Sequence, residues 1–143
     1  MSNNLAENLF IITAPSGAGK TTLIKNVIEF AKKNDEKVFM SVSDTTRIPR
    51  SNELDGTDYL FISEEEFKVN IDDQIYIEHA RVHGNLYGTP KQPIEQHLKS
   101  GFKVLLEIDW QGAMEILKTY PEAQSIFICP PSIEELHKRL HDR

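Results

Sequence analysis

The stretch LFIITAPSGAGKTT, residues 9–22, sets the architecture expected for the whole chain. Residues 9–12 are wholly apolar, which is typical of a short parallel strand buried on both faces. Residues 14–21, APSGAGKT, match a Walker A phosphate loop in which alanine replaces the first glycine. Apolar residues then recur at helical spacing, at Leu23, Ile24, Val27, Ile28 and Ala31. A strand before the loop and a helix after it are the context that this motif requires.

The chemistry of this loop predicts ATP as a ligand and Mg²⁺ as a cofactor. Backbone N–H groups at the start of a helix can bind phosphates, and Lys20 can reach the β- and γ-phosphates. The hydroxyl of Thr21 can bind Mg²⁺. The residues expected at the ATP site are Ala14, Pro15, Ser16, Gly17, Ala18, Gly19, Lys20, Thr21 and Thr22.

Two carboxylates, Glu107 and Asp109, stand at the end of a second apolar run, residues 104–109. Residues two apart on a strand face the same side, so we expect both carboxylates to point the same way. Asp109 is the natural acid to hold Mg²⁺ with Thr21, through a water molecule. The alternative is that Asp109 only caps the helix that follows it.

The remaining apolar runs predict an α/β fold with a P-loop NTPase-type parallel sheet flanked by helices. Residues 38–42, 104–109 and 125–129 are expected to be further buried strands of this sheet. Ser132 and Glu135 can cap a last helix near the end of the sequence.

The middle of the chain has a different pattern, with polar residues interleaved in the strand-like segments 57–62 and 74–82. Between them, Ser63 and Glu66 form a capping box for a short helix. We therefore predict a small α+β subdomain, partly antiparallel, that lies over the C-terminal edge of the parallel sheet. Its expected bounds are residues 41–100, which leaves residues 1–40 and 101–143 as the P-loop core.

Composition excludes several classes of protein. The chain has 143 residues, with 22 Asp and Glu against 16 Lys and Arg, which disfavours a nucleic-acid partner. No apolar run approaches the ~20 residues that a membrane helix needs, and the N-terminus has no signal-peptide pattern. The single cysteine, Cys129, fits a reducing compartment and is interpreted as core packing, and Trp110 is expected to pack at a sheet–helix junction. We predict a soluble cytoplasmic protein without a membrane partner.

A local anion site is nevertheless indicated by residues 41–50, SVSDTTRIPR. Arg47 and Arg50 stand three apart around a proline, and arginine forks suit phosphate oxygens. Tyr59 and Tyr87 are candidate neutral hydroxyl donors to the same anion. The alternative is that both arginines are ordinary solvated surface residues.

Seven motifs in order resemble the guanylate kinase family of P-loop nucleoside monophosphate kinases. They are SVSDTTRIPR at 41–50, Glu53, DGTDY at 55–59, EHA at 78–80, GNLYGT at 84–89, LEIDWQG at 106–112 and PPS at 130–132. Their order and spacing agree with the family from the phosphate loop to residue 143. The resemblance implies phosphoryl transfer from ATP to GMP or dGMP in purine nucleotide metabolism, with Mg²⁺.

The resemblance also implies a role for individual residues. Those that match the binding site for GMP are Ser43, Arg47, Arg50, Glu53, Tyr59, Glu78, Tyr87, Thr89 and Glu107. The arginines and tyrosines among them are expected to hold the phosphate, and Ser43, Glu78 and Thr89 to recognise guanine. The chemistry of the base agrees, because guanine presents N1–H and N2–H₂ donors that one carboxylate can accept, whereas adenine does not. The expected catalytic residues are Lys20, Arg47, Arg50, Arg139 and Arg143. The resemblance implies that the last two belong to a lid, which starts at residues 136–143.

Three departures from the family pattern qualify these expectations. Asp44 stands where relatives often have a neutral or basic residue, so we expect its charge to weaken the nearby arginines. Glu107 replaces the usual aspartate and is one methylene longer. This difference puts a contact between Glu107 and guanine in doubt. Relatives also continue beyond residue 143, so we expect the segment alone to turn over ATP poorly.

Two other functions fit parts of the pattern. A non-catalytic guanylate-kinase-like binding module is the first, although such modules typically lose the phosphate-loop lysine that is present here as Lys20. The second is a P-loop kinase that acts on another small phosphate acceptor.

Overall fold

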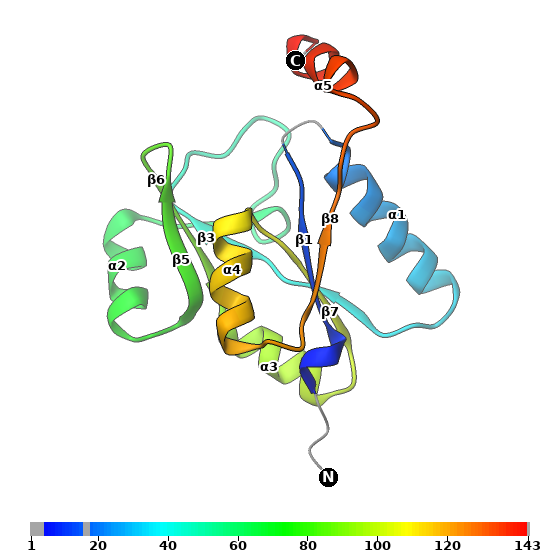
Figure 1. Ribbon diagram of the computed structural model, residues 1–143. Helices are drawn as coiled ribbons and strands as arrows, with labels where there is room; N and C mark the ends of the chain where they lie inside the picture. The colour runs from blue at the N-terminus through cyan, green and yellow to red at the C-terminus, as the bar shows by residue number, and fades with distance from the viewer. Residues whose placement is uncertain (1–4, 16–17, 143) are drawn as a thin grey trace.

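The computed structural model describes residues 5–15 and 18–142, and it contains two sheets (Figure 1). The first has the order β2-β7-β1-β8, with every neighbouring pair parallel. Its strands are β1 (Leu9–Thr13), β2 (Val38–Met40), β7 (Lys103–Glu107) and β8 (Gln124–Phe127). The parallel sheet predicted from the apolar runs is therefore confirmed.

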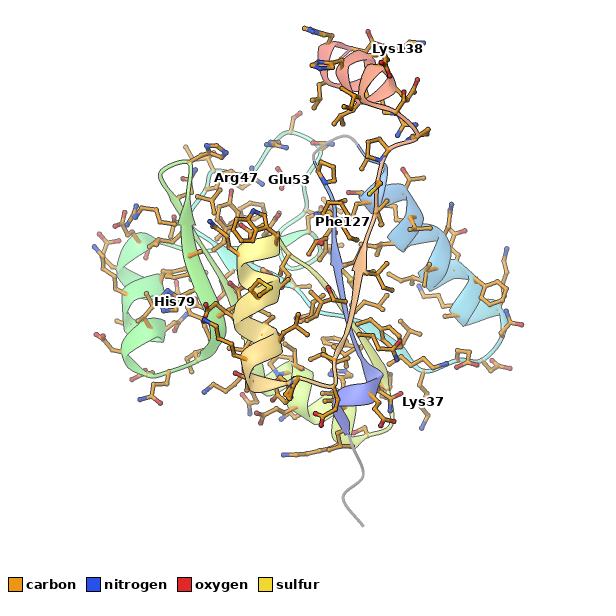
Figure 2. The ribbon with its side chains drawn as sticks, in the orientation of Figure 1. Lys37, Arg47, Glu53, His79, Phe127 and Lys138 are labelled. Atoms are coloured by element: carbon orange, nitrogen blue, oxygen red, sulfur yellow. The ribbon has the colours of Figure 1, made fainter. Side chains whose placement is uncertain are left out.

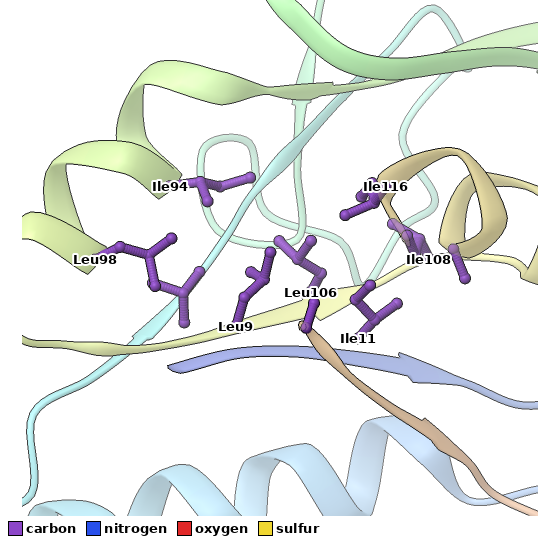
Figure 3. Packing of buried hydrophobic residues seen from close by; sticks show 10 residues of the cluster. Leu9, Ile11, Ile94, Leu98, Leu106, Ile108 and Ile116 are labelled. Atoms are coloured by element: carbon purple, nitrogen blue, oxygen red, sulfur yellow. The ribbon is translucent and has the colours of Figure 1, made fainter. Parts of the chain in front are cut away.

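Helices cover both faces of this sheet. Helix α1 (Lys20–Lys33) lies on one face, and α3 (Lys91–Lys99) and α4 (Trp110–Thr119) lie on the other (Figure 1). Successive strand residues point to opposite faces, so Ile11 packs toward α3 and α4, while Ile12 packs toward Ile24 of α1. Figure 3 shows the larger of these clusters. Its labelled members are Leu9, Ile11, Ile94, Leu98, Leu106, Ile108 and Ile116.

The second sheet lies within the segment predicted as a subdomain. Its order is β4-β3-β6-β5, with β3 parallel to β4 and the other pairs antiparallel. The strands are β3 (Ser43–Thr45), β4 (Tyr59–Phe61), β5 (Tyr76–Val82) and β6 (Asn85–Pro90). Helix α2 (Glu64–Asp72) covers it and buries Phe67 against Tyr76 and Leu86. The predicted cap is present, because the Ser63 hydroxyl accepts a hydrogen bond from the Glu66 N–H at 3.1 Å.

The predicted segments and the folded elements differ at two boundaries within this middle region. The strand expected at 38–42 ends at Met40, and the chain then crosses to the second sheet as β3. Helix α3, placed in the predicted subdomain, contributes Ile94 and Leu98 to the main core. The division at residues 40 and 100 therefore stays a prediction.

Strand β8, Cys129 and Trp110, all expected in the interior, are exposed. Strand β8 is the outer strand of the parallel sheet as described, so all four of its residues are exposed, and Cys129 just beyond it is exposed as well. The interpretation of Cys129 as core packing is wrong. Trp110 is 65% exposed at the first turn of α4, so it does not fill the junction predicted for it.

The last helix, α5 (Ile133–His141), begins at Ser132, whose hydroxyl accepts from the Glu135 N–H as predicted. It buries none of its residues and stands away from both sheets (Figure 1). Across the described parts of the chain, every helix is too short or too polar to pass through a bilayer.

Candidate active site

The phosphate loop joins β1 to α1, and its geometry depends on a glycine. Gly19 caps α1 with a φ of 90°, a left-handed conformation that a side chain disfavours. Lys20 and Thr21 therefore open the first turn of the helix, where backbone N–H groups have no partner within the helix. Ala14 and Pro15 follow β1, Ala18 precedes the cap, and Thr22 lies in the first turn of α1, so their role at the ATP site stays a prediction. Ser16 and Gly17 lie outside the described residues.

The acid beside this loop is Glu107 rather than Asp109. Glu107 ends β7, and its Oε1 lies 3.5 Å from the Thr21 hydroxyl, which donates to it, and 3.8 Å from Lys20 Nζ. Asp109 lies beyond the strand and caps α4, because its Oδ1 accepts the Gly112 N–H at 2.8 Å. The two carboxylates thus have different hydrogen-bond partners, but both line one cavity with Lys20, so their common orientation stays a prediction. The capping role left open for Asp109 is present.

A cavity of about 240 Å³ connects the phosphate loop with the second sheet. Its lining residues are Lys20, Ser43, Tyr59, Glu78, Ala80, Val82, Tyr87, Glu107, Ile108 and Asp109. The fold therefore brings the loop lysine together with five residues of the expected acceptor site. Two further expected residues, Arg47 and Thr89, contact members of this set.

Arg47 is held by Glu53 through a two-pronged ion pair (Figure 2). Arg47 Nη1 and Nη2 donate to Glu53 Oε1 and Oε2 at 2.9 and 2.7 Å, and Nη1 also donates to the Ile48 carbonyl at 3.0 Å. The Arg50 N–H donates to Glu53 Oε1 at 3.1 Å, while its side chain is 72% exposed. Glu53 thereby fixes the loop that carries both arginines. The hydrogen bonds from Arg47 hold the pKa of Glu53 below its ordinary value, and the same contact raises the pKa of Arg47.

Aromatic side chains surround the Arg47 guanidinium. Its Cζ lies 5.4 Å from the centre of the Tyr59 ring and 5.9 Å from that of Phe61, within the range of cation–π attraction. The Tyr59 and Tyr87 rings meet edge to face, with centroids 6.0 Å apart. Burial raises the pKa of Tyr59, so its hydroxyl stays a neutral donor at physiological pH.

Glu78 and Thr89 form the most enclosed polar pair of the cavity. They are register partners on β5 and β6, and the buried Thr89 hydroxyl donates to Glu78 Oε1 at 2.5 Å. Burial raises the pKa of Glu78, and the charges of Asp109 and Glu115 act in the same direction. Hydrogen bonds donated by a ligand would stabilise the charged form of such a buried carboxylate.

The hydrogen-bond partner of Asp44 is Tyr76, not an arginine, so the expected effect of its charge on Arg47 and Arg50 stays a prediction. Asp44 is buried between β3 and α2, where the Tyr76 hydroxyl donates to Oδ2 at 2.7 Å and Asn70 donates to that hydroxyl at 3.1 Å. Burial raises the pKa of Asp44. The sequence could have predicted this placement, because successive side chains of a strand alternate and Asp44 must point to the face opposite Ser43 and Thr45.

Helix α5 brings one of the two expected lid arginines to the phosphate loop. Arg139 Nη1 lies 4.0 Å from the position that a β-carbon on Gly19 would occupy, and Nε donates to Glu135 at 3.0 Å. Arg143 lies outside the described residues. Within residues 5–15 and 18–142, no three His, Cys, Asp or Glu side chains converge as a metal cage, so His137 and His141 do not belong to one.

Together the parallel sheet, the glycine-capped phosphate loop and the cavity beside it define a P-loop nucleotide-binding protein with a second polar site facing the loop. The guanylate kinase family model matches residues 6–143, and the chain belongs to this family. The resemblance inferred from the motifs is thereby confirmed.

Individual relatives agree with this assignment. Guanylate kinase of Dechloromonas aromatica is 48% identical over 139 residues, which cover 97% of this chain and 67% of the relative. Guanylate kinase of Idiomarina loihiensis is 50% identical over 136 residues, 95% of this chain and 64% of the relative. The crystal structure of guanylate kinase from Anaplasma phagocytophilum has a TM-score of 0.74 at 38% identity, and covers 92% of this chain and 64% of that one. The chain thus spans about two thirds of the length of these relatives.

Proposed function

We propose that this chain carries the ATP and GMP sites of a cytoplasmic enzyme that transfers the γ-phosphoryl group of ATP to GMP or dGMP, in purine nucleotide metabolism. The observation that carries the proposal is the shared cavity, which places Lys20 of the phosphate loop opposite Glu78, Tyr59 and Tyr87. ATP on the loop and GMP on the second sheet would meet there.

The acceptor needs no general base. The phosphate of GMP is already ionised, so one of its oxygens attacks the γ-phosphorus directly, while the bond to the β–γ bridging oxygen breaks and ADP leaves. The barrier is mainly the repulsion of the two anions and the spread of charge over the transferred group. Lys20, Arg47 and Arg50 supply positive charge to both sides of this reaction, and Arg139 approaches the loop from α5.

Mg²⁺, when bound with ATP, neutralises charge on the β- and γ-phosphates. The residues present fit this ion, because the Thr21 hydroxyl and the Glu107 carboxylate place hard oxygen donors 3.5 Å apart beside the loop. Few protein ligands are needed, since Mg²⁺ keeps several waters. We therefore assign the acid nearest the metal to Glu107, while Asp109, which caps α4 with one oxygen, lines the same cavity.

Guanine selection belongs to the second sheet. Glu78 can accept N1–H and N2–H of guanine, with Thr89 and Ser43 near the other polar edge of the base. Adenine presents an acceptor at N1 and would meet the carboxylate unfavourably. Sites built on such hydrogen bonds can discriminate by ~10⁴–10⁵.

The test has a binding part and a turnover part. Titration calorimetry measures the affinity of the protein for GMP, AMP and guanosine, and coupled ADP release measures its turnover with GMP, dGMP, AMP, CMP and UMP. We expect GMP and dGMP to be the acceptors, and Lys20→Ala to lower kcat on the order of a thousandfold. Turnover with AMP or UMP but not GMP would refute the assignment of the acceptor. GMP binding without any turnover would favour the non-catalytic binding module.

A further inference from the structure

The first turn of α4 leaves a space that the Glu78 carboxylate occupies. Gly112 is the third residue of this helix, and a β-carbon built on it would lie 2.9 Å from Glu78 Oε2 and 3.1 Å from Cδ. Both distances are shorter than the ~3.5–4.0 Å at which non-bonded atoms pack well. Any residue other than glycine at position 112 would therefore displace Glu78 or the helix.

Helix formation does not explain this glycine. Alanine is the better residue in a helix, and the φ angle of Gly112 is not in the left-handed region. Its N–H donates to the Asp109 cap, and an alanine keeps that N–H, although its β-carbon would lie 3.3 Å from Asp109 Oδ1, a milder crowding than that against Glu78. What an alanine could not do is leave Glu78 where it is.

A β-carbon at position 112 would displace the Glu78 side chain rather than the helix, because Glu78 has open space into which it can move. On one side of Glu78 lies the 240 Å³ cavity of the candidate site. On the other lies an open hollow of about 300 Å³, which Glu78 shares with His79, Trp110 and Met114. The fold can thus accommodate a new methyl group if the Glu78 carboxylate rotates away from it. That rotation would break the hydrogen bond from Thr89.

We infer that Gly112 is a positioning residue for base recognition, which holds the second oxygen of Glu78 in the place where guanine donates to it. This inference rests on the proposed function, in which Glu78 accepts N1–H and N2–H. Thr89 fixes Oε1 from one side, and the bare Cα of Gly112 allows Oε2 to lie against α4 from the other. Both contacts are needed, because a carboxylate that accepts two parallel donors has little freedom to rotate.

The variant Gly112→Ala tests this inference through the ratio of two affinities. Inosine monophosphate keeps the N1–H and lacks the 2-amino group, so it reports the second donor separately. We expect Gly112→Ala to weaken GMP binding about 10- to 100-fold, the range for a hydrogen bond to a charged group, and to reduce the GMP preference over inosine monophosphate. The affinity for ATP and the melting temperature should be unchanged or higher. Gln111→Ala, one residue earlier on the exposed side of the same turn, is the matched control and should leave GMP affinity unchanged.

A double-mutant cycle with Glu78→Asp separates positioning from general damage. The shorter acid withdraws from the new methyl group, so Gly112→Ala should cost less GMP affinity in the Glu78→Asp background than in the wild type. Equal GMP preference in Gly112→Ala and the wild type, or an equal loss of ATP and GMP with a lower melting temperature, would overturn the inference. A wild-type chain that does not prefer GMP would instead refute the proposed function, and the inference with it.

Discussion

Replacement of Glu53 by glutamine should weaken both the fold and the phosphate site, because this carboxylate holds the loop that carries Arg47 and Arg50. In the wild type it accepts two hydrogen bonds from the Arg47 guanidinium and one from the Arg50 N–H. Glutamine has the same shape, but it turns one acceptor into a donor that faces a guanidinium N–H. The variant therefore breaks the two-pronged pair with little change in volume.

The burial of the pair sets the size of the effect. The Arg47 and Glu53 side chains are 16% and 12% exposed, so the pair lies between a surface bridge and a fully buried one. Hydrogen bonds to charged groups contribute ~1.5–3 kcal/mol, and we expect a loss of about 2 kcal/mol in the free energy of unfolding. For a chain of this length that corresponds to a melting temperature lower by roughly 5–10 °C.

The dependence of stability on pH below neutrality gives a second test of this ion pair. Arg47 lowers the pKa of Glu53 in the folded state, below its ordinary value of 4.5. The stability from this pair is therefore fully present above that ordinary value, and is lost as the pH falls through the lower pKa of the folded state. The difference in melting temperature between wild type and Glu53→Gln should be constant from pH 7 to about pH 5, and should shrink below pH 4.5.

Thermal melts between pH 3 and pH 7, with calorimetric titrations of GMP and guanosine, measure these effects. Glu64→Gln is the control, because Glu64 also bridges two cations, Lys68 and Arg81, each at 3.2 Å, but is 46% exposed. We expect it to melt within about 2 °C of the wild type. Glu53→Gln should bind GMP more weakly and guanosine unchanged. The reasoning is refuted if both variants melt alike, or if the loss is equal for the two ligands.

The other two predictions concern the interior of the second sheet. Asp44→Asn should raise the melting temperature at pH 7, because burial raises the pKa of this carboxyl and its charged form is disfavoured in the fold. Melts should show the gain shrinking as the pH falls and vanishing only below 3.8, where the wild-type carboxyl is protonated in both states. A gain that is independent of pH would contradict this account. Phe67→Ala should lower the free energy of unfolding in urea by about 3–5 kcal/mol, because Phe67 is fully buried against Tyr76. Phe30→Ala, at an exposed site on α1, should change it by less than about 0.5 kcal/mol, and equal losses would show that Phe67 is not a core residue.

The parts of the fold that the sequence predicts well are those with local causes. The strand, loop and helix around Gly19 lie within one short segment, and the cap at Ser63 needs only the N–H of Glu66. The crossing of the chain after Met40 has no such local cause. Strand β3 pairs with residues 59–61 and 87–88, so its position depends on partners distant in sequence.

The same distinction explains why Glu107, and not Asp109, contacts Thr21 of the phosphate loop. Their two-residue spacing places them on one side only if the strand continues through both. The strand ends at Glu107, and the backbone turns into α4 through Ile108, so one oxygen of Asp109 caps the helix while its side chain still lines the cavity. Apolar content misleads at β8 for a related reason, because a run of Ile and Phe does not reveal whether a further strand covers it.

Three carboxylates in and beside the second sheet show why a motif gives the position of an acidic group but not its protonation state. Glu53, Asp44 and Glu78 are equivalent as sequence, three acids in a chain with a net charge of −6. Folding gives Glu53 a guanidinium partner, which lowers its pKa, and buries Asp44 and Glu78 with hydroxyl donors, which leaves their pKa values raised. Asp44 points away from the cavity and Glu78 into it, so only Glu78 can be relieved by donors from a ligand. Selection of a base with two adjacent donors therefore depends less on the presence of an acid than on the groups that prevent it from turning toward water.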